Sequence, residues 1–488
     1  MCRVQSGTGR SSLPRPSSTH GEASLHPGQS TVSGPLLLCS RLYSDKRTIA
    51  TVGGILAPGY RKDSTGVRVL VVGSGGREHA LCWKIAQSPL LTKLYAAPGN
   101  PGIASLAECQ PVDLSDPSAI LELARHLRID MVVIGPEDPL ALGVSDALIR
   151  AGITVFGPSQ QAAQIESSKH FAKQVMEAVG VPYPFSASFS DFAAAERYVL
   201  TLPEGRIVVK ADCLFRGKGV MITDSRREAL AVLESMLIYR QFGTAGQKAI
   251  VEQFLEGDER SYIALCDGER AVLFPAARDH KRALDGDRGP NTGGMGAIVP
   301  ALRAQDPKLD AIESQIFRPV LQELARRGSP FRGALFAGVM LTNEGPKVLE
   351  FNARFGDPEA ETLLPLLEDD LLPLLYATAT GSLSTQSLRM RVGACVSVVL
   401  ASAGYPDHYD TGMPIEHLEE AAQKPNVLIF HAGTALQEHQ LITAGGRVFC
   451  ISGIGSDLAT ARRAAYAAAE EISWHGKQFR RDIGASWQ

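Results

Sequence analysis

The 488-residue chain lacks the features that would assign it to several special classes of protein. It has no dense run of Lys and Arg and a formal net charge of -3, so we expect no nucleic-acid partner. Its longest apolar stretches, such as Val67–Val72, are far too short to span a bilayer, so we expect no membrane association. Its eight cysteines are scattered without a CxxC pair, which argues against a zinc site or a disulfide framework and favours a reducing compartment.

Acidic residues are scarce in the first 66 positions. Only Glu22, Asp45 and Asp63 occur there, against eleven Ser and eight Lys or Arg. This composition is typical of an organelle transit peptide, and a disordered tail or a wrongly assigned start is the alternative. We expect folded structure to begin at Val67.

The remainder has the composition of a globular protein, with 44% apolar and 21% charged residues overall, and is long enough for two to four domains. Strands and helices alternate from Val67 to Phe156, which predicts an open parallel sheet with helices on both faces. The predicted strands are 67–72, 94–97, 131–134 and 153–156, and the predicted helices are 77–88, 120–127 and 140–151.

After Lys169 short strands follow one another, which predicts α+β structure with antiparallel pairing. The predicted strands are 206–211, 249–254, 261–266, 271–275, 334–341 and 347–351, with one long helix at 309–327. From about Val392 a smaller unit closes the chain.

A glycine-rich turn, Gly73-Ser-Gly-Gly-Arg-Glu-His79, directly follows the first strand and opens a helix. Glycines let the backbone approach a phosphate, and a helix N-terminus supplies free N–H groups, so we predict phosphate binding. A purely structural tight turn is the alternative. A nicotinamide-binding fold is disfavoured, because Glu78 occupies the third glycine position and no acidic ribose anchor follows the second strand.

A second motif runs from Ile207 to Lys210 and continues to Gly219, with Lys218 in its glycine loop. A lysine that ends a strand, followed by a flexible loop that carries another, suits a clamp over nucleotide phosphates. The alternative is a solvated surface hairpin.

A third motif, from Val348 to Asp357, ends a strand with Glu350 and Asn352 two residues apart. Residues two apart on a strand share a face, so these side chains should converge while Leu349 and Phe351 face the core. Two oxygen ligands completed by ATP phosphates make a Mg²⁺ site (or a Mn²⁺ site). An amphipathic edge strand is the alternative.

A fourth segment, from Asp279 to Gly296, contains Asp279-His-Lys-Arg282 and Gly289-Pro-Asn-Thr-Gly-Gly-Met-Gly296. Clustered glycines expose backbone N–H groups, and the flanking charges suit a small zwitterion or a phosphate.

These motifs, in this order, resemble the phosphoribosylamine–glycine ligase (glycinamide ribonucleotide synthetase) family of the ATP-grasp superfamily. Its most specific stretches here are GSGGREHAL, APGNPG, VIGPEDPL, DHKR, GPNTGGMGA and VLEFNARFGDPE, and the resemblance covers essentially residues 67–488. It implies an α/β and α+β multidomain fold: a parallel α/β domain at 67–168, an ATP-grasp domain at 169–391 with a lid at about 190–258, and a carboxy-terminal domain at 392–488. Segment 1–66 would be a plastid transit peptide, as in plant and algal members, with the mitochondrion as the alternative.

The resemblance also implies a reaction. ATP phosphorylates glycine, and the amine of phosphoribosylamine attacks the resulting glycyl phosphate to give glycinamide ribonucleotide in purine biosynthesis. The partners are therefore small molecules, and we expect a monomer. A carboxylase with the same fold and a non-catalytic nucleotide sensor are the alternatives.

The site residues implied by the resemblance fall into four groups. The catalytic group is Lys210, Lys218, Asp279, Arg354 and Asp357. The ATP-binding group is Lys169, Lys210, Lys218, Glu252, Gln253, Phe254, Leu255 and Glu259. The metal ligands are Glu350 and Asn352. The substrate-binding group is Gly73, Gly75, Gly76, Arg77, Asn100, Gly102, Gly135, Pro136, Glu137, Asp279, Lys281, Asn291, Thr292, Gly293, Gly294, Met295, Arg354, Gly356 and Asp357.

The chain departs from the family pattern at a few positions. Cys213, Phe215 and Arg216 stand where the family usually has small residues in the phosphate loop, so we expect altered loop closure and altered ATP affinity. Arg278 replaces a usual Gln, and Glu361 stands where Gln is frequent.

Overall fold

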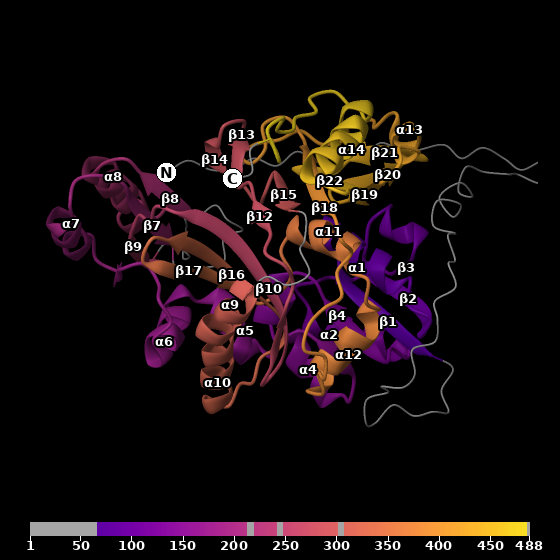
Figure 1. Ribbon diagram of the computed structural model, residues 1–488, viewed down its shortest axis with the longest axis horizontal. Coiled ribbons are helices and arrows are strands. Elements are labelled where there is room, and N and C mark those ends of the chain that lie inside the picture. Colours follow the sequence, from indigo (N-terminus) through magenta and orange to yellow (C-terminus); the bar gives the residue numbers. More distant parts are fainter. Residues whose placement is uncertain (1–65, 212–218, 242–246, 301–306, 486–488) are drawn as a thin grey trace, which may run out of the picture. The chain divides into compact units, whose positions relative to one another are not determined.

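The structure is a computed structural model, and it describes residues 66–211, 219–241, 247–300 and 307–485 (Figure 1). The first folded element is a five-stranded sheet in the order β3-β2-β1-β4-β5, and every neighbouring pair in it is parallel. The strands are β1 (Val67–Gly73), β2 (Leu91–Pro98), β3 (Glu108–Cys109), β4 (Met131–Ile134) and β5 (Thr154–Phe156). The prediction of an open parallel sheet is confirmed.

Helices cover both faces of this sheet, because its strands are apolar on both sides. One face, with Val69 and Val71, packs against α1 (Gly76–Ile85) and α12 (Leu371–Thr380). The other face, with Leu70 and Val72, packs against further helices. These are α2 (Pro117–His126), α3 (Glu137–Ala141), α4 (Val144–Arg150) and α5 (Gln160–Ser167).

The single helix predicted over 140–151 is wrong. The structure has two helices, α3 and α4, separated at Gly143. Gly143 has a φ of 80°, in the left-handed region that ends helices and that glycine adopts without a steric penalty.

The next region contains a four-stranded antiparallel sheet in the order β6-β9-β7-β8. Its strands are β6 (Ser186–Phe189), β7 (Ile207–Ala211), β8 (Val220–Thr223) and β9 (Ala249–Gln253). Helices α7 (Phe192–Thr201) and α8 (Arg226–Leu237) pack on it through a small core of their own, and Figure 1 shows both beside these strands. Helix α6 (Lys169–Val179) precedes this sheet, and the Ser168 side chain caps its N-terminus.

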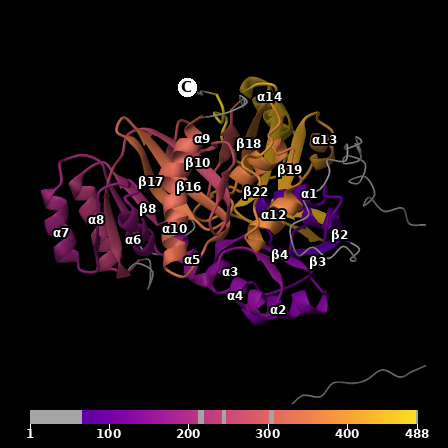
Figure 2. The ribbon, with the colours of Figure 1, turned by 60° about the horizontal axis from the view of Figure 1, so that its bottom comes forward.

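A second four-stranded sheet has the order β11-β10-β16-β17, with antiparallel pairs, as predicted. The strands are β10 (Asp258–Asp267), β11 (Ala271–Leu273), β16 (Arg332–Thr342) and β17 (Gly345–Asn352). The long helix predicted over 309–327 is present as three joined pieces. They are α9 (Pro307–Ile312), a π-helical turn η5 (Glu313–Phe317) and α10 (Arg318–Arg326), which lies alongside β16 in both views (Figures 1 and 2).

The alternation predicted for β17 is wrong at Leu349. The pairing of β16 with β17 shifts between Gly338 and Val339, so the strand contains a bulge. As a result Val348 and Phe351 lie in the core, whereas Leu349 is only half-buried.

The last sheet joins distant parts of the chain, in the order β12-β15-β18-β22-β19. Strands β12 (Arg278–Asp279) and β15 (Gly296–Val299) come from the middle of the sequence, and β13 (Arg282–Leu284) and β14 (Arg288–Asn291) form a hairpin between them. The later strands are β18 (Ala394–Ala401), β19 (Val427–His431) and β22 (Arg447–Gly455). The remaining elements are α11 (Glu359–Leu363), η6 (Leu364–Leu366), α13 (Leu418–Ala422), β20 (Thr434–Gln437), β21 (Gln440–Thr443), α14 (Leu458–Glu471) and the short turn η3 (Ile103–Ser105). Within the described ranges, no helix has the length and apolarity needed to cross a bilayer.

Candidate active site

Two glycine turns at the carboxyl ends of β1 and β4 meet at the side chain of Glu78. A Cβ atom on Gly73 or on Gly135 would collide with the Glu78 side chain. One Glu78 oxygen accepts a hydrogen bond from the backbone N–H of Gly75 (2.6 Å), and the other pairs with the Arg77 guanidinium (2.6 Å). The turn therefore presents a buried carboxylate next to its backbone N–H groups.

Asp357 approaches the same turn from a distant part of the sequence. Its Oδ2 accepts from the backbone N–H of Arg77 (3.4 Å), and its Oδ1 pairs with Arg447 Nη1 (3.1 Å). Burial alone would raise the pKa of Asp357, but the Arg447 charge, followed by that of Arg77, lowers it, so this carboxyl stays ionised. The N-terminus of α1 is thus capped by an anion from the third motif.

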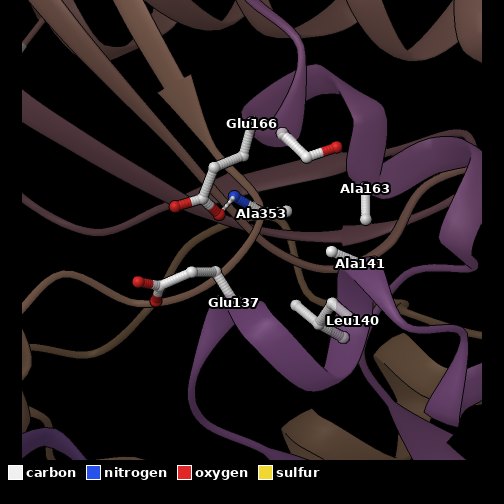
Figure 3. A pocket seen from close by; sticks show the side chains of 7 residues that line it. Glu137, Leu140, Ala141, Ala163, Glu166 and Ala353 are labelled. Carbon is white, nitrogen blue, oxygen red and sulfur yellow. Dashed lines mark hydrogen bonds between the residues drawn. The ribbon is translucent and has the colours of Figure 1, made fainter. Parts of the chain in front are cut away.

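Arg354 is held between two carboxylates, those of Glu137 and Glu166. Its Nε lies 3.2 Å from Glu137 at the start of α3, and its Nη2 lies 2.9 Å from Glu166 in α5. Glu137 and Glu166 line a small pocket together with Leu140, Ala141, Ala163, Ser167 and Ala353, and Figure 3 shows both acidic side chains on the same side of it. Glu166 also accepts a hydrogen bond from the backbone N–H of Ala353 (2.7 Å). Burial raises the pKa of Glu166 despite the Arg354 charge, whereas Glu166 and Glu137 raise the pKa of Arg354 against its burial. The orientation of Arg354 is therefore fixed by both neighbours.

Glu350 lies within a group of lysines. Its Oε1 is 3.5 Å from Lys281 Nζ, which also binds Glu259 (2.6 Å). Burial alone would raise the pKa of Glu350, but Lys281, followed by Lys210 and Lys169, lowers it to about 2. Two of the predicted ATP-binding lysines, Lys169 and Lys210, thus lie close enough to the predicted metal ligand Glu350 to interact electrostatically.

Glu252 is the buried counter-ion of two lysines. One oxygen lies 2.6 Å from Lys173 Nζ and the other 2.5 Å from Lys210 Nζ, and the Glu252 side chain is 3% exposed. Lys210 Nζ also donates to the backbone carbonyl of Leu349 (3.2 Å). Glu252 therefore positions Lys210.

The glycine loop of the fourth motif is fastened by Arg447. Its Nη1 donates to the carbonyls of Gly293 (2.7 Å) and Asp357 (2.7 Å), so one side chain connects two motifs. Thr292 N and Oγ1 both bind the Lys281 carbonyl (2.7 and 2.9 Å). Asp279 lies beneath this loop, and burial, followed by the charge of Glu359, raises its pKa well above its usual range.

The proposed metal ligands suit a cation that is shared with phosphate. No group of three or more His, Cys, Asp or Glu side chains is arranged to hold a metal within the described part of the chain. Glu350 is an ionised oxygen donor, and the Asn352 Oδ1 accepts a hydrogen bond from Arg354 (3.2 Å). Two oxygen donors leave most of a Mg²⁺ shell to phosphate and water, which is the usual arrangement for this ion.

Other predicted residues have structural partners. Asn100 donates to the carbonyls of Ser74 and His431 (both 2.8 Å), and a Cβ on Gly102 would collide with His431. Asn291 donates to the Val220 carbonyl (3.4 Å). Pro136 is the N-cap of α3, and Leu255 and Met295 are buried. Three predicted glycines leave room for an acidic side chain, because a Cβ would collide with Glu359 at Gly356, with Glu361 at Gly76 and with Asp279 at Gly294.

Gln253 and Phe254 follow Glu252 where β9 ends, with Gln253 exposed and the Phe254 ring 5.1 Å from the Arg206 guanidinium. Lys218, Cys213, Phe215 and Arg216 lie outside the described residues.

The sequence reasoning missed three charged residues that hold the site together: Glu166, Lys173 and Arg447. Arg447 lies in the carboxy-terminal stretch Gly445-Gly-Arg-Val448, which also resembles the family's last domain, and this resemblance was a signal for it. Glu166 and Lys173 flank Lys169 on two helices, and nothing in their spacing distinguishes them from surface charges.

Models of protein families match three stretches of the chain. They are the phosphoribosylglycinamide synthetase N domain at residues 67–166, the ATP-grasp (A) domain at 167–360 and the C domain at 395–486. The chain belongs to the phosphoribosylglycinamide synthetase family.

Relatives that are named phosphoribosylamine–glycine ligase are similar over almost their whole length. A phosphoribosylamine–glycine ligase of Agrobacterium fabrum is 46% identical over 424 residues, which cover 86% of this chain and 98% of that one. The trifunctional purine biosynthetic protein adenosine-3 of Gallus gallus is 43% identical over 420 residues, covering 86% of this chain and 42% of that one.

Solved structures agree with the fold. The crystal structure of a phosphoribosylamine–glycine ligase from Thermotoga maritima has a TM-score of 0.74 at 33% identity, covering 86% of this chain and 100% of that one. An N5-carboxyaminoimidazole ribonucleotide synthetase from the same organism has a TM-score of 0.56 at 17% identity, covering 84% of this chain and 99% of that one, and shares the fold alone. The predicted fold class is confirmed: α/β and α+β, with an amino-terminal parallel sheet, an ATP-grasp domain and a carboxy-terminal domain.

Proposed function

We propose that this chain joins glycine to 5-phosphoribosylamine at the expense of ATP, giving glycinamide ribonucleotide, ADP and phosphate in purine biosynthesis. The observation that carries the proposal is that this member of the family has two charged clusters. One consists of lysines around Glu350, and the other consists of the Glu78 and Asp357 carboxylates at the turn before α1. The chain is a ligase that forms C–N bonds, as its relatives are named.

The domain organisation belongs to the same proposal. Residues 67–168 would hold phosphoribosylamine, 169–391 would hold ATP, with 190–258 as the lid, and 392–488 would close the site. The support for the last role is the sheet that β12 and β15 share with β18, β19 and β22.

The lysine cluster suits the triphosphate of ATP. Lys169, Lys210 and Lys218 would neutralise its phosphates, and in the described ranges Lys210 is fixed by Glu252 and by the Leu349 carbonyl. Segment 252–255 would border the adenine, and Glu259 would hold the ribose. Glu350 and Asn352 would hold Mg²⁺ (or Mn²⁺), which when bound would neutralise charge on the transferring phosphoryl group.

The chemistry follows from the weakness of a carboxylate as an electrophile. One oxygen of the glycine carboxylate attacks the γ-phosphorus of ATP, ADP leaves, and glycyl phosphate forms. The amine of phosphoribosylamine then attacks the acyl carbon, the C–O bond to phosphate breaks, and the nitrogen gives up one proton. Enzymes of this kind act mainly by positioning and by charge neutralisation, and water must be excluded because acyl phosphates hydrolyse.

Arg354, Asp279 and Asp357 would act between the two clusters. Arg354 is oriented by two carboxylates and also donates to Asn352 and to the Phe355 carbonyl, so its one remaining N–H has a fixed direction. The carboxylates of Glu78 and Asp357 at the turn suit the amine and hydroxyl donors of phosphoribosylamine. Loop 289–296 would cover glycine, with Lys281 and Thr292 joined at its base.

We also propose that residues 1–66 direct the protein to a plastid, or alternatively to a mitochondrion, and that it works as a monomer. The support for the leader is its acid-poor, Ser-rich composition.

The proposal is tested by phosphate release from ATP and Mg²⁺, with glycine or phosphoribosylamine omitted in turn. Release that requires both cosubstrates, together with formation of glycinamide ribonucleotide, is the expected result. Phosphate release at the same rate with and without phosphoribosylamine would contradict the assigned acceptor. ATP binding without any phosphate release would indicate a nucleotide sensor.

A further inference from the structure

Glu361, on α11, is a buried carboxyl group whose nearby cation, Arg447, is already paired with Asp357. The residue is 0% exposed, and neither of its side-chain oxygens has a hydrogen-bond donor from another group in the described ranges. An ionised carboxylate without compensating hydrogen bonds is strongly disfavoured away from water. The proposed reaction assigns no role to this residue.

The carboxyl of Glu361 lies beside that of Asp357, at the N-terminus of α1. A Cβ on Gly76 would collide with Glu361 Oε1, and a Cβ on Gly75 would lie 3.4 Å from Asp357 Oδ2. The two carboxyls thus face consecutive glycines of one turn, close enough for a hydrogen bond between them to contribute to the pKa of each. Two carboxyl groups can share a hydrogen bond only when one of them carries a proton.

The charges around the pair balance one anion and not two. Arg447 is the cation that binds the Asp357 carboxylate (3.1 Å), and it also donates to the backbone carbonyls of Gly293 and Asp357. Arg77 is already paired with Glu78 (2.6 Å). The titratable and charged groups on the elements packed against α11 are Arg77, Glu78, His79, Cys82 and Lys84 on α1, Cys395 on β18, and Arg447 and Cys450 on β22, with Asp357 and Glu359 adjacent in sequence; β15 has none.

We propose that Glu361 carries a proton at neutral pH and donates it to Asp357, which makes Glu361 a positioning residue for Asp357 in the ligation reaction. This role rests on the proposed function, because Asp357 is assigned there to the substrate site. Burial, followed by the charge of Asp357, raises the pKa of Glu361 well above its usual range, in agreement with the geometry.

The arrangement makes the turn sensitive to pH. With one proton, Asp357 stays against Arg77 N–H and Arg447, and the α1 N-terminus keeps its shape. When Glu361 loses the proton, two adjacent anions share one arginine, and Asp357 is repelled from its place. The affinity for the ribonucleotide should therefore fall at alkaline pH.

The first measurement does not depend on turnover. The full chain is labelled with ¹³C at the Glu side-chain carboxyl, and carboxyl resonances are followed against pH by NMR. The resonance lost in Glu361→Gln should be that of a protonated acid at pH 7 and should titrate in the alkaline range. A resonance that titrates near pH 4, as an ordinary Glu does, would overturn the proposal.

The second measurement links the proton to the site. Glycinamide ribonucleotide, the stable product, is titrated calorimetrically into wild type, Glu361→Gln, Glu361→Leu and the exposed control Glu420→Gln. Above the pKa of Glu361, wild type and the control should lose about tenfold in affinity per pH unit, as expected for one required proton. Glu361→Gln keeps a donor at every pH and should lose this alkaline decline, whereas Glu361→Leu, which has no donor, should bind weakly throughout.

An alkaline decline that persists unchanged in Glu361→Gln would overturn the positioning role. A protonated Glu361 by NMR in a chain that binds no glycinamide ribonucleotide at any pH would overturn the link to the reaction and leave the shared proton established. The failure of the inference and the failure of the proposed function are thus distinguishable.

Discussion

Glu252 provides a sharp test of how the lysine cluster is built. Glu252→Gln keeps the shape of the side chain and removes the one negative charge that Lys173 and Lys210 share. Removing one partner of a buried ion pair costs about 3–5 kcal/mol, because the remaining charge is left uncompensated. We therefore expect this substitution to destabilise β7 and β9 by about that amount.

The control is a solvent-exposed ion pair at the ends of β7 and β8. Arg206 and Asp224 are 3.2 Å apart, with side chains 58% and 77% exposed, and such pairs contribute at most about 1 kcal/mol. Asp224→Asn removes the same charge from an exposed position directly after β8. The difference between the two variants thus measures burial and not charge.

Hydrogen exchange of the peptides that cover β7 and β9 is a suitable assay, because a multidomain chain does not unfold in a single two-state step. A loss of 3–5 kcal/mol corresponds to exchange faster by about two to three and a half powers of ten. The double variant Lys173→Met with Glu252→Gln should recover part of the loss, since it leaves one buried cation and not two. Exchange in Glu252→Gln within about fivefold of that in Asp224→Asn would refute the reasoning, because that is the size expected of an exposed pair.

The effect should also depend on pH in a defined direction. Burial alone would raise the pKa of Glu252, but Lys210, followed by Lys173, lowers it below its usual range. The stabilisation that the ionised Glu252 contributes is therefore fully present above its unfolded pKa of about 4.3, and it is lost as the pH falls through the folded pKa. The difference in the stability of β7 and β9 between wild type and Glu252→Gln should shrink in that acid range and stay constant from pH 6 to 8.

Three further predictions are independent of this one. Glu350→Gln should raise the Mg²⁺ concentration needed for half-maximal phosphate release by about tenfold or more. The control Leu349→Met, at the half-buried bulge, should leave that concentration unchanged. If Glu350→Gln behaved as wild type at limiting Mg²⁺, Glu350 would be excluded as a ligand. Glu166→Gln weakens the hold on Arg354 and should lower kcat by about tenfold with a smaller effect on the KM for ATP; equal changes in both would indicate general damage. Residues 1–66 fused to a fluorescent protein should enter a plastid or a mitochondrion, and a cytosolic fusion would count against a transit peptide.

Much of the fold was predictable because the signals are local. The apolar run at Val67–Val72 gives a strand buried on both faces, and the alternation of strands and helices up to Phe156 gives a parallel sheet. Gly143 was also a local signal that was overlooked, since a left-handed glycine ends α3. The bulge at Leu349 depends on the partner strand, and no pattern within β17 itself indicates it.

The site was less predictable because its decisive contacts join distant residues. Arg77 N–H and Asp357 are 280 positions apart, and Glu166 reaches Ala353 across 187. The glycines were recognised as a turn, but the reason for them is the Glu78 side chain that they accommodate. A motif states which residues matter, whereas long-range packing decides what each side chain contacts.

The half-buried Glu350 and the fully buried Glu361 show why the surroundings of a carboxyl decide its role. Burial opposes ionisation in both, yet the pKa of Glu350 is lowered to about 2 and that of Glu361 is raised well above the usual range. Glu350 faces three lysines, whereas Glu361 shares one arginine with the carboxylate of Asp357. The sequence pointed to Glu350 as a metal ligand but gives the protonation state of neither residue, because both are Glu within the same twelve residues of the third motif and α11. Glu350 is therefore fitted to bind a cation, and Glu361 to hold a proton.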